Sequence, residues 1–152
     1  MAIEAPLSRH KRNDFILYIA ACLAAAAWFA YDGYISASFR QDHTDEQGKP
    51  DSALVINRQA PPFLVAGAVL FAGYYWAIKG RKVVAEENGL VIAGKEKIPY
   101  DAIEQIDKTH FEKRGVFTIT YKKAGRMVSR KLTDRQYDRL APILDHLIAK
   151  IT

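Results

Sequence analysis

Two long uncharged runs constrain the fold of this chain more than any other feature of its sequence. Residues 15–31 read FILYIAACLAAAAWFAY, and residues 60–78 read APPFLVAGAVLFAGYYWAI. An α-helix rises about 1.5 Å per residue and the hydrocarbon core of a bilayer is about 30 Å thick, so about twenty apolar residues cross it. The second run has this length, and the first reaches it if its helix continues past Asp32. The runs therefore predict transmembrane helices at 15–35 and 60–79.

Aromatic clusters in both runs favour helices that span a membrane. Tyrosine and tryptophan prefer the boundary between lipid and water, because they combine an apolar ring with a polar atom. The clusters are Trp28, Phe29, Tyr31 and Tyr34 at the end of the first run, and Tyr74, Tyr75 and Trp76 at the end of the second. One alternative is a buried hairpin, but only about seventy residues would remain to cover two helices that are apolar all round. The other is a cleaved signal peptide, with small residues near Ala25 and Ala27. Hydropathy favours two spans over both alternatives.

The charged residues beside the two runs predict the orientation of the helices. Lys and Arg are concentrated before the first run, as Arg9, Lys11 and Arg12, and after the second, as Lys79, Arg81 and Lys82. Because an excess of Lys and Arg marks the cytoplasmic flanks of membrane helices, both termini are expected in the cytoplasm. The expected layout is a cytoplasmic tail at 1–14, an external loop at 36–59 and a cytoplasmic domain at 80–152. The membrane would be the inner membrane of a bacterium.

Small residues and two prolines indicate how the helices begin and pack. In lipid the hydrophobic effect no longer drives helix association, so close approach through small side chains is favoured. The candidates are Ala20, Ala24 and Ala27 in the first helix, and Gly67, Ala68, Ala72 and Gly73 in the second. Pro61 and Pro62 suit the first turn of the second helix, where no backbone donor is needed.

After Arg81 the pattern changes to short alternating runs separated by turn residues. Such runs predict a meander of antiparallel strands. The expected strands are 82–85, 90–93, 115–122 and 126–132, with turns at Asn88–Gly89, at Gly94 and at 123–125. Phe117, Ile119 and Tyr121 alternate, so they should share one face of their strand.

An amphipathic helix is expected at the C-terminus. Its apolar stripe at helical spacing consists of Tyr137, Leu140, Leu144, Leu147, Ile148 and Ile151. Thr133 and Gln136 have the spacing of a capping box, so the helix should begin there, and Pro142 should kink it. The stripe would cover the open end of the sheet, with Leu144 and Leu147 buried together with Ile103 and Ile119.

Residues 89–107, GLVIAGKEKIPYDAIEQID, resemble the bacterial pleckstrin-homology (PH) domain families in which the domain follows two transmembrane helices. The shared pattern is a Gly-apolar strand, an Ile-Pro-aromatic turn and Ile-x-x-Ile, and the resemblance covers residues 82–151. It implies a membrane helical hairpin followed by an α+β cytoplasmic domain, a PH-like antiparallel β-barrel or sandwich capped by a C-terminal helix. It also implies a non-enzymatic module for oligomerisation, protein docking or complex assembly, without fixed ligand residues.

No set of residues has the spacing of a catalytic site. The chain contains no Ser-His-Asp order, Gly-rich phosphate loop or Cys-His pair, so no enzyme activity, small-molecule substrate or cofactor is expected. His43 and Asp51 could contribute to a divalent-cation site, but their spacing matches no known cation-binding loop. A solvated polar loop and no metal are therefore expected there. Cys22 is the single cysteine, which excludes an internal disulfide.

Basic residues are the remaining candidates for binding. The net charge of +5 arises after Gly80, because basic and acidic residues balance before it. Candidate contacts to anionic lipids or to a partner are Arg81, Lys82, Lys113, Arg114, Lys122, Lys123 and Arg126. A cation close to an anionic membrane surface contributes about 1 kcal/mol. Nucleic acid is not an expected partner, since no DNA- or RNA-binding motif occurs.

Two functions from different classes fit these observations. The first is an accessory or scaffold subunit, or an assembly factor, of a larger membrane complex, with other membrane protein subunits as partners. The absence of a catalytic set and the resemblance to a docking module favour this function. Order in the tail MAIEAPL and in the polar loop at 36–59 would favour it too, because such segments fray unless neighbouring chains hold them. The second is a self-associating or anionic-lipid-binding membrane module.

Overall fold

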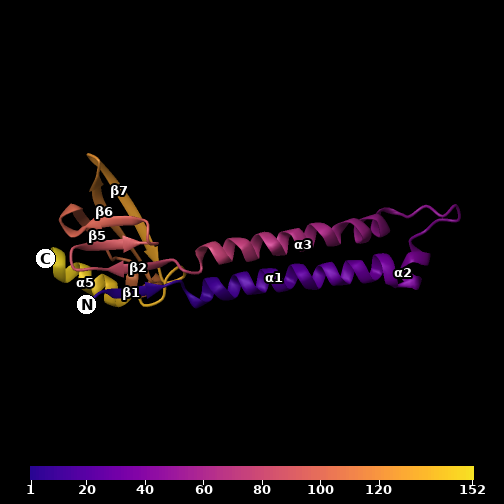
Figure 1. Cartoon of the computed structure of the whole chain (residues 1–152), viewed down its shortest axis with the longest axis horizontal. Coiled ribbons are helices and arrows are strands. Elements are labelled where there is room, and N and C mark those ends of the chain that lie inside the picture. Colours follow the sequence, from indigo (N-terminus) through magenta and orange to yellow (C-terminus); the bar gives the residue numbers. More distant parts are fainter. The chain divides into compact units, whose positions relative to one another are not determined.

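The computed structural model describes all 152 residues, and they form two compact units. Residues Asn13–Trp76 form one unit, which we call the helical hairpin. Residues Met1–Arg12 and Ala77–Thr152 form the other, the β domain. Both ends of the chain therefore belong to the same unit (Figure 1).

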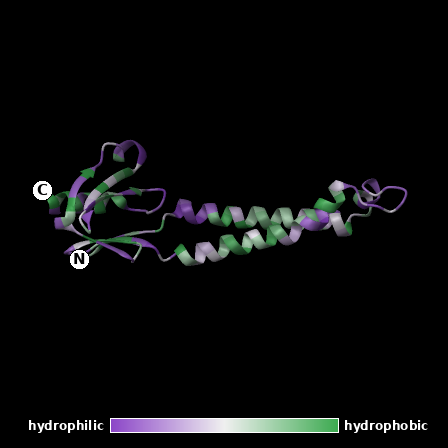
Figure 2. Ribbon diagram, turned by 90° about the horizontal axis from the view of Figure 1, so that it is seen from above, coloured by the Kyte–Doolittle hydropathy of each residue, from purple (hydrophilic) through white to green (hydrophobic).

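The helical hairpin consists of two long helices that lie side by side (Figure 1). The first is α1 (Arg9–Ala30), which continues as the π-helix η1 (Tyr31–Ile35), and the second is α3 (Ser52–Ile78). The short helix α2 (Ala37–Asp42) belongs to the segment of chain that connects them. Only 11% of the apolar window of each long helix is buried within the chain, and Figure 2 shows that apolar residues dominate both. Two helices are thus long and apolar enough to cross a membrane, as the sequence predicts.

Pro61 and Pro62 lie inside α3, and the prediction that they occupy its first turn was wrong. The helix begins at Ser52 instead, where the Asp51 carboxylate accepts from the Leu54 amide at 2.9 Å. A proline within a helix cannot donate to the carbonyl four residues earlier. The two prolines therefore leave the carbonyls of Asn57 and Arg58 without their usual helical partners.

Residues of the π-helix η1 supply a donor for one of these two carbonyls and make a second hydrogen bond to α3. The Tyr34 hydroxyl donates to the Arg58 carbonyl at 3.0 Å, and the Arg58 Nε donates to the Gly33 carbonyl at 3.1 Å. Gly33 is buried, and a Cβ there would lie 2.9 Å from the Asn57 carbonyl oxygen. Only glycine permits this approach, so the five residues Gly33, Tyr34, Asn57, Arg58 and Pro62 form a joint that links the two helices. We call it the proline joint.

The opposite end of the hairpin is joined by aromatic rings. The Phe15 ring lies 5.5 Å from that of Tyr74 and 6.0 Å from that of Tyr75, and the Tyr18 ring lies 5.6 Å from that of Phe71. Tilted ring pairs at these separations attract one another beyond the effect of area burial. The aromatic cluster therefore holds the start of α1 beside the end of α3.

The small residues predicted to pack the two helices together were correct only in part for α3 and wrong for α1. Ala68 is buried, and Gly67 faces Cys22, whose Sγ would lie 3.9 Å from a Cβ on the glycine. In α1 the buried alanine is Ala26, whereas Ala20, Ala24 and Ala27 are exposed, as are Ala72 and Gly73 in α3. The reason is that Phe15 fixes the contact face, and Cys22 and Ala26 continue that face at helical spacing.

The β domain consists of two antiparallel sheets and a C-terminal helix. The first sheet has the order β1 (Ile3–Pro6), β2 (Lys82–Ala85), β3 (Gly89–Ile92), β4 (Glu96–Pro99). The second has the order β5 (Ile103–Asp107), β6 (Val116–Lys123), β7 (Arg126–Thr133). The short helices η2 (Tyr100–Ala102) and α4 (Phe111–Arg114) connect strands, and α5 (Leu140–Ile151) ends the domain. The two sheets do not close, so the barrel allowed by the sequence is not formed.

Strand β1 comes from the segment that precedes the first helix, where the sequence predicts only a tail. It pairs antiparallel with β2 from Ile3 opposite Ala85 to Pro6 opposite Lys82. Beyond the strand, the Ser8 amide donates to the Gln136 carbonyl at 2.9 Å. The tail is thus held by its own chain and needs no neighbouring subunit for its order.

The core of the β domain matches the predicted one. Ile103, Ile119, Leu144 and Leu147 are buried in one cluster, and Phe117, Ile119 and Tyr121 share the buried face of β6. The four strands predicted from the alternating runs agree with β2, β3, β6 and β7 to within a residue or two. Periodicity identified these elements because one face of each strand must be apolar to reach the core.

The start of the last helix was predicted incorrectly. Thr133 ends β7, and its carbonyl accepts from the amides of both Gln136 and Tyr137, so these residues form a turn and no capping box. Helix α5 begins at Leu140. Pro142 therefore lies in the first turn, where a missing donor costs nothing, and the expected kink has no cause.

We expect Leu144→Ala to lower the unfolding free energy of the β domain by about 2–5 kcal/mol, the usual cost of truncating a buried leucine. Leu144 is 3% exposed in the core cluster. Amide hydrogen exchange along β6 in the full chain measures this quantity. A change below about 0.5 kcal/mol, as at surface sites, would show that α5 is not packed on the sheets.

We expect Gly33→Ala to destabilise the helical hairpin by about 1–3 kcal/mol, because the new methyl group would overlap the Asn57 backbone. Gly73→Ala is the matched control, since nothing lies within 4 Å of a Cβ at Gly73. There the better helix propensity of alanine should leave stability equal or higher. Thermal loss of helical circular dichroism in detergent compares the two variants. Equal midpoints would contradict the proline joint.

Candidate functional site

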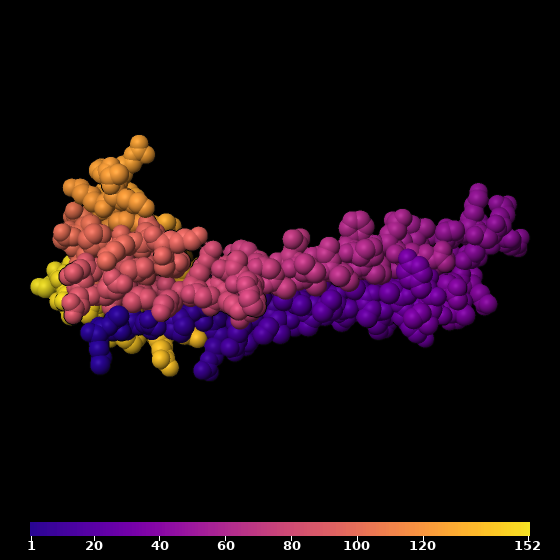
Figure 3. Space-filling view, in the orientation of Figure 1, coloured from indigo at the N-terminus to yellow at the C-terminus, as the bar shows by residue number.

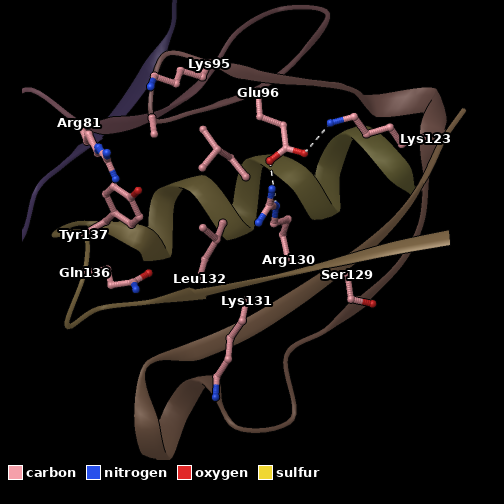
Figure 4. Close-up of a pocket in the computed structure, with 12 residues that line it drawn as sticks. Arg81, Lys95, Glu96, Lys123, Ser129, Arg130, Lys131, Leu132, Gln136 and Tyr137 are labelled. Carbon is pink, nitrogen blue, oxygen red and sulfur yellow. Dashed lines mark hydrogen bonds and ion pairs between the residues drawn. The ribbon is translucent and has the colours of Figure 1, made fainter. Parts of the chain in front are cut away.

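A groove of about 690 Å³ is hollowed into the β domain (Figure 4). We call it the basic groove because five cationic side chains and one carboxylate line it. The lining residues are Arg81, Ile92, Ala93, Lys95, Glu96, Lys123, Ser129, Arg130, Lys131, Leu132, Gln136 and Tyr137. They come from both sheets, from the residue before β2, from the turn between β3 and β4 and from the turn after β7. The groove thus lies where the two unclosed sheets meet.

Glu96 is the centre of the polar contacts in the basic groove. It begins β4 in the first sheet, and its carboxylate accepts from Arg130 Nε at 2.8 Å and from Lys123 Nζ at 3.3 Å, both in the second sheet (Figure 4). The buried Tyr121 of β6 also donates its hydroxyl to this carboxylate. The Glu96 side chain is only 14% exposed, so these contacts are partly shielded from solvent. Glu96 therefore ties the two sheets together across the groove.

The ionisation of Glu96 and Tyr121 reflects this arrangement. Burial alone would raise the pKa of the Glu96 carboxyl, but hydrogen bonds from Tyr121, Arg130 and Lys123 outweigh burial and hold the pKa below its ordinary value. Burial, followed by the hydrogen bond to the carboxylate, raises the pKa of the Tyr121 hydroxyl. At neutral pH the carboxylate is thus charged and the phenol is a donor.

The floor of the basic groove is apolar. Leu132 and Tyr137 are buried at 2% and 8% exposure, and Ile92 and Ala93 are half-buried. Burial raises the pKa of the Tyr137 hydroxyl, although the nearby Arg81 lowers it in part. The groove therefore offers an apolar floor with a rim of positive charge, and Glu96 already satisfies Arg130 and Lys123.

The structure brings only two of the seven predicted contact residues into the basic groove. These are Arg81 and Lys123. Lys82 pairs with Glu4 of β1 at 2.6 Å, while Lys113 and Arg114 lie in α4. Lys122 and Arg126 flank the tip of the β6–β7 hairpin, which projects in orange in Figure 3. The seven residues do not form one site.

Sequence reasoning missed four charged residues of the groove, Lys95, Glu96, Arg130 and Lys131. Glu96 meets its partners Tyr121 and Arg130 across separations of 25 and 34 residues. No local pattern reports such a pairing. The one available signal is that Glu96 and Arg130 stand among alternating strand residues, where a charge on the inward face needs a partner.

The loop between the long helices is held by its own side chains. His43 Nδ1 lies 2.7 Å from Asp51 Oδ2, and the other oxygen of Asp51 caps α3 at the Leu54 amide. The Leu54 amide, followed by His43, lowers the pKa of the Asp51 carboxyl. No group of three or more His, Cys, Asp or Glu side chains that could hold a metal ion occurs in the chain. The His43–Asp51 pair therefore has a structural explanation in the helix cap.

Comparison with protein-family models, with curated proteins and with solved structures gives no significant match to this chain.

We expect Glu96→Gln to destabilise the β domain at neutral pH and to flatten its pH dependence. Because the Glu96 pKa is depressed on folding, its contribution is present above the unfolded-state pKa and is lost as the pH falls through the folded-state pKa. The difference in unfolding midpoint between wild type and variant should therefore shrink between about pH 5 and pH 3. Glu104→Gln, at an exposed position of β5, is the control and should change little. A difference that stays constant with pH would refute the assigned role of Glu96.

Proposed function

We propose that this chain is a non-enzymatic integral membrane protein, an accessory or scaffold subunit or an assembly factor of a larger membrane complex. The helical hairpin would anchor it and the β domain would dock other subunits. The observation that carries the proposal is the basic groove, an open hollow with an apolar floor and a cationic rim. Surfaces that combine apolar contact with a charged rim are typical of protein docking sites.

We also propose that both termini are cytoplasmic and that the loop between the helices is external, in the inner membrane of a bacterium. The pairing of β1 with β2 supports this layout, because two strands of one sheet must lie on the same side of a membrane. Two crossings return the chain to that side. The Lys and Arg residues beside the helices favour the cytoplasm as that side.

The PH-like character of the β domain is part of the proposal. Strands of two antiparallel sheets followed by one C-terminal helix agree with the order expected from the resemblance, as a sandwich without closure. Order in the N-terminal segment no longer counts as support for neighbouring subunits, since β1 and Ser8 are held by the chain itself. The proposal rests on the groove instead.

A second candidate function is binding of anionic lipid headgroups or self-association. The observation that favours lipid is the position of Arg81, which lines the groove and follows the last residue of α3, Ile78, closely in the sequence. A cation so near a membrane helix lies within reach of headgroups, where it contributes about 1 kcal/mol.

Extraction in a mild detergent, followed by a native gel and mass spectrometry, distinguishes the two functions. We expect this chain to migrate with other polypeptides, and to remain with them at high salt because apolar burial does not depend on ionic strength. A ladder of this chain alone would instead support self-association.

Two sets of substitutions test whether the groove is the docking surface. Replacing Arg81, Lys95 and Lys131 by Gln should reduce the recovery of partners, since these cations line the groove without pairing to Glu96. The matched control replaces Lys113, Arg114, Lys122 and Arg126, which lie outside the groove, and should leave recovery unchanged. The opposite pattern would move the docking surface to α4 and the hairpin tip.

A further inference from the structure

Strand β7 is an end strand that borders the basic groove. It is eight residues long, with β6 on one side and no strand on the other. Four consecutive residues of β7, Ser129 to Leu132, line the groove. Side chains of a strand alternate between its two faces, so consecutive lining residues mean that the groove runs along the edge of the strand. The groove therefore includes the open main-chain edge of β7.

The hairpin geometry identifies which main-chain groups of β7 point outward. Ala124 and Gly125 form a two-residue turn with φ values of 51° and 76°, as in a type I′ hairpin. In such a hairpin the closing pair, here Lys123 and Arg126, exchanges both of its main-chain hydrogen bonds. Hydrogen-bonded and non-hydrogen-bonded pairs then alternate along the regular β6–β7 register.

The amides and carbonyls of Met127, Ser129 and Lys131 consequently face away from β6. Two further contacts agree with this alternation of hydrogen-bonded and non-hydrogen-bonded pairs. The Thr133 carbonyl, two residues beyond Lys131, also faces away from β6, and it accepts from the amides of Gln136 and Tyr137 in the turn after β7. The Ser129 hydroxyl lies 3.1 Å from the hydroxyl of Thr120, its partner in a non-hydrogen-bonded pair. Ser129 and Lys131 thus present unpaired donors and acceptors at the groove.

The charge and polarity beside this edge define what can occupy it. Charged residues on an edge strand can serve only to prevent unwanted pairing with other chains. If this edge were uniformly charged, that role alone would explain its cations. Here an apolar floor of Ile92, Leu132 and Tyr137 lies beside the cations, and such a floor would serve an alternating apolar side chain. Lys95 and Lys131 have no carboxylate partner, so they favour acidic side chains.

We propose that an extended acidic segment of a partner protein adds to β7 as a further antiparallel or parallel strand. Its main chain pairs with Ser129 and Lys131, carboxylates on one of its faces meet Lys131, and apolar side chains on its other face contact Leu132. The inference rests on the proposed docking function and adds the chemistry of the partner segment.

The test uses the full chain in nanodiscs of neutral phosphatidylcholine and a fluorescent eight-residue peptide of alternating Glu and Val. Proline at an edge position whose N–H faces outward removes no bond of the β6–β7 ladder. We therefore expect Ser129→Pro to weaken peptide binding by about tenfold, since outward pairing is lost. Ser129→Ala is the matched control, because it also removes the Thr120 contact but keeps the amide, and it should bind like wild type.

A second variant keeps the test decisive if Ser129→Pro fails to fold. Lys131→Glu should abolish binding of the Glu-Val peptide and create binding of a Lys-Val peptide that the wild type ignores. Amide hydrogen exchange should slow at Ser129 and Lys131 when the Glu-Val peptide is added. Equal affinities of Ser129→Pro and Ser129→Ala, or of wild type for both peptides, would overturn the inference.

Two outcomes separate this inference from the proposed docking function. If subunits co-purify but the peptide neither binds nor slows exchange at β7, the docking function stands and the strand-addition inference is wrong. If phosphatidylglycerol vesicles slow exchange at Ser129 and Lys131 while the peptide does not, the groove binds headgroups and the inference is also wrong. Peptide binding without any co-purifying subunit would support the site and contradict the accessory role.

Discussion

Strand β1 precedes the first long helix and β2 follows the second, yet the two strands pair along four residues. This pairing places the two segments that flank the helical hairpin in one sheet. It also buries Ala5 together with Val83 and Ala85 in the core of the β domain. The pairing explains why so short an N-terminal segment is ordered.

The hairpin exposes apolar faces, and in the membrane location proposed above the exclusion of water would not hold its two helices together. Specific contacts at its two ends replace that force. In the proline joint the Tyr34 hydroxyl donates to the Arg58 carbonyl, which Pro62 leaves without a helical donor. Gly33 allows the two helices to approach closely there. Aromatic rings around Phe15 join the other end. In the β domain, Glu96 links the two sheets and leaves the outer cations of the basic groove without a partner.

Sequence reasoning predicted the elements whose signal is local. The apolar runs predicted α1 and α3, and alternation predicted the β6–β7 hairpin and its buried face. It failed where partners are distant in the chain. Strand β1 has only four residues, one of them Pro6, and its partner lies beyond both helices. The groove is equally non-local, because Glu96 and Arg130 belong to different sheets. The first residues of α3 and α5 were also predicted incorrectly, from the two prolines and from the capping-box spacing. The cap by Asp51 and the turn after Thr133 determine where these helices begin.

The most direct test of the central claim is cysteine accessibility in intact cells or spheroplasts, in a Cys22→Ala background. Single cysteines replace Ala2 before β1, Gln47 in the loop and Ala124 at the hairpin tip, all of which are exposed. An impermeant thiol reagent should label the cysteine at position 47 and leave those at 2 and 124 unlabelled until the membrane is opened. Labelling of position 2 but not position 124, or of 124 but not 2, would contradict the pairing of β1 with β2 across a two-helix anchor.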